Sequence, residues 1–264
     1  GKNTLSGAAG LDYLYGGTGD DTYVFTEGDG GLGFNADVIS EYASEGTDTI
    51  ALENVLTGDV LMWTDCSGNL VVRYSATDEI AISAGWDYTN GGGSLIGDYV
   101  EEIVFDDTTV WDLTNGIHVK FHDNGGSTYG TAYNDTVEGG AGADTLYGHD
   151  GNDLIIGGGD SDWYFGGDGE DTFRLVDTSN DNIYDFSLLE DDKIDIADLL
   201  SAYDPLNDVL SDFAEFADSS GNSILSVDID GTGSTHSMTQ IATLYNITGL
   251  DADDLVMSGN LLVA

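Results

Sequence analysis

The sequence predicts an all-β protein whose main body is a parallel β-solenoid. Three observations lead to this fold class. A glycine-rich motif of nine residues recurs along the chain, and 38 glycines accompany a single proline. Outside the motif, apolar residues form short runs bounded by Gly, Asn and Asp, with no long helical period. The sequence therefore predicts short strands joined by many regular turns.

The repeat follows the rule G-G-x-G-x-D-x-U-x, in which U is an apolar residue. Five units follow one another without a gap from Gly130 to Arg174: GTAYNDTVE, GGAGADTLY, GHDGNDLII, GGGDSDWYF and GGDGEDTFR. A shorter block contains GAAGLDYLY from Gly7 and GGTGDDTYV from Gly16. The six residues before it, GKNTLS, have Asn3 where the other units have Asp.

Each place in the unit has a physical role. Glycines at the first, second and fourth places allow a tight turn, and the Asp at the sixth place directs its carboxylate into the same concavity. The last three residues form a short strand whose eighth-place side chain faces the core. Those side chains are Leu14, Tyr23, Val137, Leu146, Ile155, Tyr164 and Phe173. Two units form one coil, so turns 18 residues apart stack on each other.

Stacked turns also place one Asp carboxylate above another. That arrangement is repulsive unless a hard cation lies between the turns, and carboxylate and carbonyl oxygens are the ligands that suit Ca²⁺. The sequence therefore predicts several calcium ions along the repeats.

These units resemble the glycine-rich nonapeptides of RTX (repeats-in-toxin) proteins, which form a calcium-bound parallel β-roll. The resemblance implies that sixth-place carboxylates and turn carbonyls hold the ions. One edge would stack Asp135, Asp153 and Asp171, the other Asp144 and Asp162, and Asn3 would pair with Asp21. The candidate ligands are Asn3, Asp12, Asp21, Gly130, Ala132, Asp135, Gly139, Ala141, Asp144, Gly148, Asp150, Asp153, Gly157, Gly159, Asp162, Gly166, Asp168 and Asp171.

Some units depart from the pattern. Thr131, Ala132 and Tyr133 replace glycine-rich places in the first unit of the long block, His149 replaces a second-place Gly, and Asp160 replaces a fourth-place Gly.

The chain divides into four segments. Residues 1–25 form the first repeat block, 26–126 a β-rich associated segment, 127–176 the second block, and 177–264 a small mixed α/β cap and export segment. The expected strands of the associated segment are Val60 to Trp63, Leu70 to Tyr74, Ile80 to Ile82 and Val100 to Phe105. There Asp37, Glu41 and Asp48 form either an additional calcium site or a solvated acidic face.

After the repeats, Ile196 to Tyr203 and Leu206 to Phe216 have helix-like spacing, interrupted at Pro205. The order of these pieces is similar to the C-terminal target domain of type I secretion substrates, particularly large surface adhesins. The resemblance places the uncleaved export signal within Leu255 to Ala264, with candidate residues Leu255, Val256, Met257, Leu261, Leu262 and Val263. We expect deletion of this stretch to block export and leave calcium-driven folding largely intact.

The charge excludes whole classes of function. Five Lys and Arg against 50 Asp and Glu give a formal net charge of −45. Phosphate backbones and anionic membrane surfaces repel such a chain, so neither nucleic-acid binding nor membrane insertion is expected. The single cysteine, Cys66, excludes an intramolecular disulfide, and it has no neighbouring His to make it a nucleophile.

Three further motifs are better explained without a site. Gly28, Gly30 and Gly33 satisfy G-x-G-x-x-G, but no helix of adequate length follows them. His118 and His122 lack the Glu of a zinc-protease helix and lie on a strand-like stretch, which favours a surface pair. The stretch from Ser226 to Gly231 lacks the final Glu of an EF-hand loop and favours a hairpin turn.

The predicted function is a calcium-binding module that folds when calcium is bound, carrying the secretion signal of a large extracellular RTX adhesin involved in adhesion and biofilm formation. Its partners would be calcium ions, the type I channel and transporter, and upstream parts of the same polypeptide, at the surface of a Gram-negative bacterium. We expect no enzyme activity. The alternatives are the same module on a secreted hydrolase or pore-forming toxin, or a sugar- or ice-binding module.

Overall fold

The computed structural model describes residues 1–33, 36–41, 46–57, 60–64, 69–83, 100–120, 125–231 and 237–264. The chain forms two compact units, which we treat separately. Unit 1 comprises Gly1–Lys120 and Tyr129–Asp135, and unit 2 comprises Phe121–Thr128 and Thr136–Ala264. Cys66 and His122, which the sequence analysis discounted as site residues, lie outside the described residues.

The described residues of unit 1 form two sheets, the strand β11 outside both of them, and one short 3₁₀ helix, η5 (Leu113–Asn115). One sheet has the order β1-β3-β5-β9-β10 and the other β2-β4-β8-β7-β6. The strands are β1 (Thr4–Leu5), β2 (Tyr13–Leu14), β3 (Thr22–Thr26), β4 (Asp37–Ser40), β5 (Thr49–Glu53), β6 (Leu61–Thr64), β7 (Leu70–Arg73), β8 (Glu79–Ser83), β9 (Glu102–Phe105), β10 (Val110–Asp112) and β11 (His118–Lys120). The expected strands of the associated segment are thus present.

Parallel pairing in unit 1 continues beyond the repeats. β1 pairs with β3, β3 with β5 and β5 with β9, all in parallel. The other sheet pairs β2 with β4 and β4 with β8 in parallel. Antiparallel strands then complete both sheets, with β10 on β9 and with β7 joining β8 to β6.

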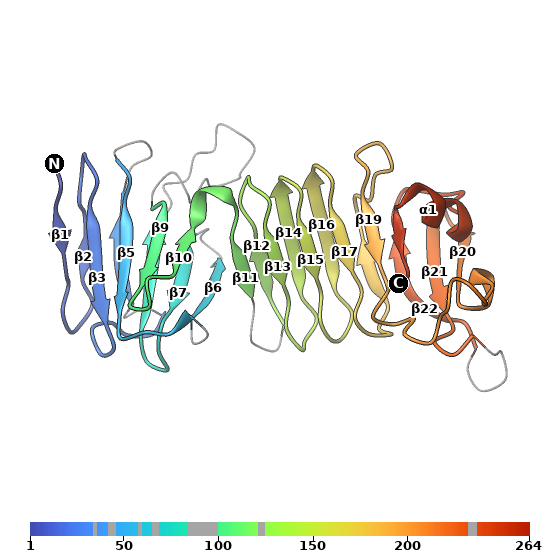
Figure 1. Cartoon of the computed structure of the whole chain (residues 1–264), viewed down its shortest axis with the longest axis horizontal. Helices are drawn as coiled ribbons and strands as arrows, with labels where there is room; N and C mark the ends of the chain where they lie inside the picture. Colours follow the sequence, from blue (N-terminus) through green and yellow to red (C-terminus); the bar gives the residue numbers. More distant parts are fainter. Residues whose placement is uncertain are drawn as a thin grey trace. The chain divides into compact units, whose positions relative to one another are not determined.

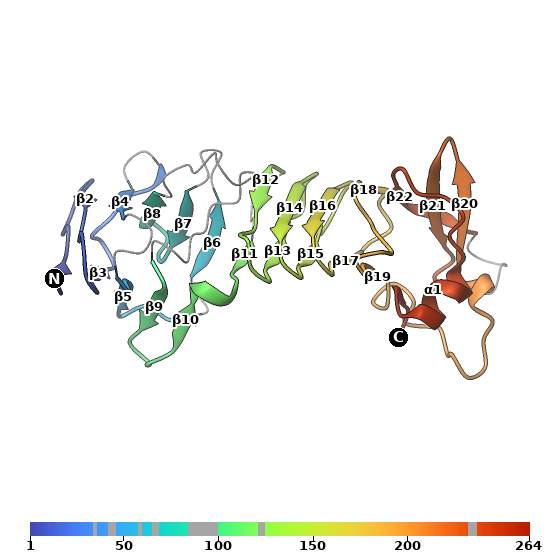
Figure 2. The ribbon, with the colours of Figure 1, turned by 90° about the horizontal axis from the view of Figure 1, so that it is seen from above.

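From Thr136 onward, unit 2 contains the long repeat block as two layers of parallel strands, visible in the two views of Figures 1 and 2. One layer has the order β13-β15-β17-β19-β23 and the other β14-β16-β18-β22-β21-β20. Its elements are β13 (Thr136–Glu138), β14 (Thr145–Asp150), β15 (Leu154–Ile156), β16 (Trp163–Asp168), β17 (Thr172–Arg174), β18 (Asp181–Ile183), β19 (Lys193–Asp195), η6 (Leu210–Asp212), β20 (Ala214–Ser219), β21 (Asn222–Val227), β22 (Thr239–Leu244), α1 (Ala252–Ser258) and β23 (Leu261–Leu262); β12 (Ser127–Tyr129) precedes them.

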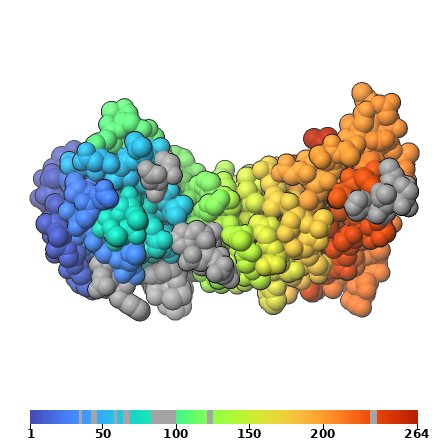
Figure 3. Space-filling view, turned by 90° about the horizontal axis from the view of Figure 1, so that it is seen from below, coloured from blue at the N-terminus to red at the C-terminus, as the bar shows by residue number. Residues whose placement is uncertain are grey.

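The register confirms the predicted coil. Val137 pairs with Ile155 and Ile155 with Phe173, while Leu146 pairs with Tyr164. Each of these eighth-place side chains is at most 1% exposed. In the first block Tyr23 is equally buried, whereas Leu14 is only half-buried. In Figure 3 successive coils of unit 2 appear as adjacent bands running from green to yellow.

An outward-facing row of aromatic rings follows one layer of unit 2. Tyr147 stacks on Phe165, Phe165 on Tyr184 and Tyr184 on Tyr245, with ring centroids 4.8, 4.8 and 4.4 Å apart. The first two rings belong to repeats, and the last two belong to the segment that follows. Because the rings are offset by one coil each, the row joins the repeats to the C-terminal strands.

Two local predictions were wrong. β14 and β16 have six residues instead of three, because pairing continues through the turns as far as Asp150 and Asp168. The helices expected at 196–203 and 206–216 are instead turns, the short η6 and the start of β20. The Asp204 carboxylate accepts hydrogen bonds from the Leu206 amide and the Asn207 side chain, a local arrangement that competes with a helix.

The structure around the three discounted motifs agrees with the interpretation that they are not sites. Gly28 to Gly33 lead into no helix in the described part. In β11 the buried Val119 alternates with the exposed His118 and Lys120, as expected for a strand. The stretch from Ser226 to Gly231 begins at the end of β21, which pairs with β22 in antiparallel.

Candidate calcium sites

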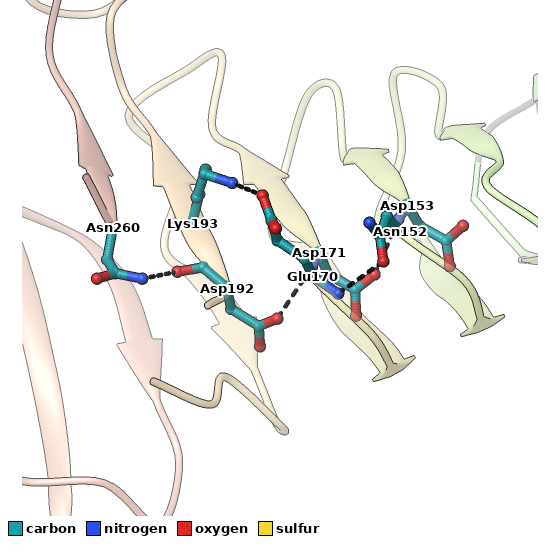
Figure 4. Close-up of polar contacts among 7 residues, drawn as sticks. All are labelled: Asn152, Asp153, Glu170, Asp171, Asp192, Lys193 and Asn260. Atoms are coloured by element: carbon teal, nitrogen blue, oxygen red, sulfur yellow. Dashed lines mark hydrogen bonds and ion pairs between the residues drawn. The ribbon is translucent and has the colours of Figure 1, made fainter. Parts of the chain in front are cut away.

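Six aspartates of unit 2, four of them at the sixth place of repeats, form two columns along its edges. The first column is Asp153, Asp171 and Asp192, and the second is Asp144, Asp162 and Asp181. In each column the backbone amide of one Asp donates to the Oδ1 of the next, over 2.8 to 2.9 Å. Figure 4 shows the first column, with the Asn260 side chain donating to the Asp192 carbonyl at its end. The columns are therefore part of the backbone hydrogen bonding of the roll.

The first-place glycines make room for these carboxylates. A Cβ atom on Gly157 would lie 2.2 Å from Asp162 Oδ2, and one on Gly166 would lie 2.2 Å from Asp171 Oδ2. The turn backbone and the carboxylate are thus in contact, which no larger residue would allow.

The inward oxygens are left without protein partners in two turns. Asp162 Oδ2 and Asp171 Oδ2 are buried and accept no hydrogen bond. Four basic side chains pair with other acids: Arg174 with Asp195, Lys193 with Glu170, Arg73 with Glu79 and Lys2 with Asp20. A buried carboxylate oxygen of this kind requires a cation or a proton.

The pKa values of the column residues also indicate that these carboxylates require a cation or a proton. Burial, with a smaller contribution from nearby carboxylates, raises the pKa of Asp162 and of Asp171 to about 7. Burial likewise raises the pKa of Asp181 to about 8 and that of Asp192 to about 6. Without a cation, the folded columns therefore disfavour their own ionised form.

Sequence reasoning missed the members of the columns that lie outside the repeats. Asp181 and Asp192 continue the columns at spacings of 19 and 21 residues instead of 18. Both begin the short pattern Asp-x-Ile, which is the end of the nonapeptide without its glycine turn. That pattern is the signal that would have found them.

Unit 1 repeats the arrangement with longer insertions. The backbone amide of Asn3 donates to Asp21 Oδ1 across 18 residues, as predicted. The backbone amide of Asp21 donates to Asp48 Oδ1 across 27 residues. Asp48 in turn donates to the Glu101 carboxylate across 53 residues. On the other edge, Asp12 donates to Asp37 Oδ1. The associated segment is therefore a continuation of the roll, with loops inserted between its coils.

The irregular first unit of the long block differs from the others. Asp135 Oδ1 accepts from the Ile117 amide, and its Oδ2 accepts from the backbone amide and the hydroxyl of Thr131. Both oxygens are thus occupied by protein donors, with Gly130 buried and Ala132 half-buried beside them. The replacement of glycine by Thr131 supplies the hydroxyl hydrogen bond to Asp135.

The remaining predicted ligands occupy varied positions. Gly139 and Gly148 are buried and lie against the carboxylates of Asp144 and Asp153, whereas Asp144 Oδ2 accepts from the Gly140 amide. Ala141, Asp150 and Asp168 are exposed and Gly159 is half-buried. Of the predicted signal residues, Leu255, Leu261 and Val263 are buried, Val256 and Leu262 are half-buried, and Met257 is 85% exposed.

These residues fit calcium. The donors are carboxylate oxygens, several of them buried and without hydrogen-bond partners, and the glycine turns leave no space for a side chain beside them. Asp162 and Asp171 have the most suitable oxygens in unit 2, and Asp21 has one in unit 1.

Comparison with known families identifies the repeats. The model of the RTX calcium-binding nonapeptide repeat matches four copies, at residues 1–32, 129–164 and 143–173. The matched repeats and the parallel coils define a calcium-binding β-roll. This chain carries an RTX β-roll, which is the family resemblance that the sequence indicated. The search among curated proteins gave no significant match.

Several solved structures share sequence with the chain. The AlgE6R3 subunit from the Azotobacter vinelandii mannuronan C5-epimerase is 25% identical, covering 56% of this chain and 79% of that one, with a TM-score of 0.33. The AlgE6R2 subunit is 26% identical, covers 56% and 92%, and has a TM-score of 0.39. Extracellular lipase LipA from Serratia marcescens is 13% identical over 100% of this chain and 40% of that one, with a TM-score of 0.30.

One functional prediction needs correction. The sequence predicted that the chain is not an enzyme, and this prediction was wrong. Its repeats do not support it, because the AlgE6R2 and AlgE6R3 subunits come from an enzyme. Repeat modules of this kind occur in catalytic proteins and leave the enzyme status of this chain undecided. Among the described residues, no helix combines the length and apolar character needed to cross a membrane.

Proposed function

We propose that this chain is a calcium-driven folding module that carries the C-terminal type I secretion signal of a large extracellular RTX adhesin of a Gram-negative bacterium. The observation that carries the proposal is the pair of Asp columns, in which buried oxygens of Asp162 and Asp171 have no protein partner. Calcium would be the main partner inside the fold, and the type I channel and transporter would be partners during export.

The physical basis is linkage between binding and folding. The metal-free chain has a formal charge of −45, and its folded form would bury carboxylates that repel one another. Each ion that binds only the folded form stabilises it by RT ln(1 + [Ca²⁺]/Kd), about 4 kcal/mol when calcium is at 1,000 times Kd. Low cytosolic calcium would keep the chain unfolded for export, and extracellular calcium would fold it.

Circular dichroism during a calcium titration tests the folding switch. We expect a disordered spectrum in chelator and a β-rich spectrum with a cooperative thermal transition once calcium is added. Equal folding and equal melting temperature in chelator and in calcium would overturn the proposal.

A substitution that removes one carboxylate charge and keeps the size of the side chain tests the columns themselves. Asp162→Asn keeps the Oδ1 acceptor for the Asp144 backbone amide and replaces the buried Oδ2 with an uncharged amide nitrogen. We expect at least a tenfold higher calcium concentration at the folding midpoint. Asp198→Asn, in an exposed turn of unit 2, is the matched control and should leave the midpoint unchanged. Equal midpoints for the two variants would exclude Asp162 as a ligand.

Export requires its own experiment. The adhesin assignment rests on the resemblance of the C-terminal segment to type I secretion substrates, and the same module on a secreted hydrolase or toxin is the alternative. The sequence of the complete gene decides between them. Secretion of a passenger fused to this chain, dependent on a type I transporter, would support the export role, and its retention in the cytosol would contradict it.

A further inference from the structure

Three acidic side chains from separate segments meet inside unit 1. Asp21 precedes β3, Glu41 follows β4 and Asp48 precedes β5. One carboxylate oxygen of each lies within 4.8 Å of the others, and all three residues are buried. The exposed fraction is 0% for Asp21 and 2% for both Glu41 and Asp48.

One oxygen of each carboxylate holds the backbone. Asp21 Oδ1 accepts from the Asn3 amide over 2.6 Å, Glu41 Oε1 from the Gly16 amide over 2.9 Å, and Asp48 Oδ1 from the Asp21 amide over 2.8 Å. The second oxygens of Asp21 and Glu41 are buried and have no hydrogen-bond partner. The backbone therefore fixes the carboxylates while leaving these oxygens for a ligand.

Glu41 occupies a particular place in the pattern. It follows the strand Asp37–Ser40 where a repeat would have its first glycine, and it lies over Gly16, the first glycine of an earlier turn. In unit 2 Asp185 stands at the corresponding place after β18, and its two oxygens accept from the Gly166 and Gly167 amides. A carboxylate thus follows both repeat blocks, but only Glu41 keeps a buried oxygen without a partner.

The environment favours a positive ligand. Burial, with smaller contributions from the carboxylates of Asp48 and Asp21, raises the pKa of Glu41 to about 7. Oxygen donors with this much negative charge select a hard divalent cation, and three carboxylates suit calcium.

We propose that Asp21, Glu41 and Asp48 together bind one calcium ion, which joins the first repeat block to the segment that follows it. This site lies outside the 18-residue spacing of the repeats, because Asp48 follows Asp21 by 27 residues and Glu41 belongs to no nonapeptide. The sequence left Glu41 and Asp48 open between a calcium site and a solvated acidic face. Their burial is inconsistent with a solvated face.

Native mass spectrometry of the full chain in calcium counts the ions directly. We expect Glu41→Gln and Asp48→Asn each to carry one calcium ion fewer than the wild type, since both keep the acceptor of their backbone hydrogen bond. The control Glu53→Gln, at an exposed residue at the end of β5, should keep the wild-type count. An unchanged count in Glu41→Gln would overturn the site.

The double variant tests whether the ion is shared. Glu41→Gln with Asp48→Asn should also lose one ion, because both residues hold the same one. Loss of two ions in the double variant, or of more than one in either single variant, would contradict a single shared site. A wild-type chain that binds no calcium would instead refute the proposed function as a whole, so the two failures are distinguishable.

Discussion

At the residue scale, the turns require a backbone conformation more than they require glycine. The second-place Gly167 has φ of 109°, and His149 keeps a positive φ of 82° at the same place of an earlier turn. Asp160 likewise has φ of 65° at a fourth place. These departures from the repeat preserve the turn at the cost of strain, about 1 kcal/mol each.

Gly167 has a second requirement, close approach of the preceding coil. A Cβ atom there would lie 1.7 Å from the His149 carbonyl oxygen. We expect Gly167→Ala to reduce the free energy of unfolding in saturating calcium by about 3 kcal/mol or more, since it adds overpacking to strain. Gly221, with φ of 88° and open space around its Cβ, isolates the strain alone. Gly221→Ala should cost only about 1 kcal/mol, and urea titrations of both variants in saturating calcium measure the two losses. Equal losses would show that coil contact adds nothing.

At the scale of elements, the C-terminal strand belongs to the roll. β23 pairs in parallel with β19, matching Leu261 to Ile194, and Asn260 donates to the Asp192 carbonyl over 2.7 Å. α1 begins at the Asp251 side chain, which accepts from the Asp254 amide. The structure therefore argues against the expectation that residues 255–264 can be deleted without affecting folding, because deletion would remove a strand and expose the end of a sheet.

Point substitutions separate folding from export better than deletion does. Leu261 is 1% exposed and Met257 is 85% exposed. We expect Leu261→Ala to reduce the free energy of unfolding by about 3 kcal/mol and Met257→Ala to change it by less than about 0.5 kcal/mol. Thermal unfolding in calcium measures both. A loss of export in Met257→Ala with unchanged stability would assign the residue to the signal, whereas equal stability of both variants would contradict the packing of β23.

The elements also show how far the sequence can be interpreted. The nonapeptides were sufficient to predict the coil, its register and the buried row from Val137 to Phe173, because nine residues fix both the turn and the strand. The continuation through Asp48, Asp181 and Asp192 was not predicted, since only Asp-x-Ile remains there and inserted loops break the spacing. The helices expected near Pro205 failed because spacing alone did not reveal the hydrogen bonds of the Asp204 side chain.

At the scale of the whole molecule, the acidic excess has two different roles. Exposed carboxylates such as Asp107 and Asp112 have pKa values lowered by hydrogen bonds from Thr109 and Thr114, and they remain charged at neutral pH. The column residues have raised pKa values because they are buried. The net charge of −45 thus combines solvation of the surface with a set of internal charges that oppose folding unless they are neutralised.

The internal charges predict an unusual response to pH. In chelator, Asp181 has a folded-state pKa of about 8, and Asp162 and Asp171 have values of about 7. Because the folded form binds protons more tightly than the unfolded form, whose Asp pKa is about 3.9, its stability should rise as pH falls from about 8 toward 4. In calcium the sign reverses, since protons compete with the metal for the same oxygens. Circular dichroism and thermal unfolding at constant ionic strength, between pH 8 and pH 5, measure both arms. A chain in chelator that gains neither structure nor stability on acidification would contradict the assignment, because it would mean that protonation of the columns does not favour the folded form.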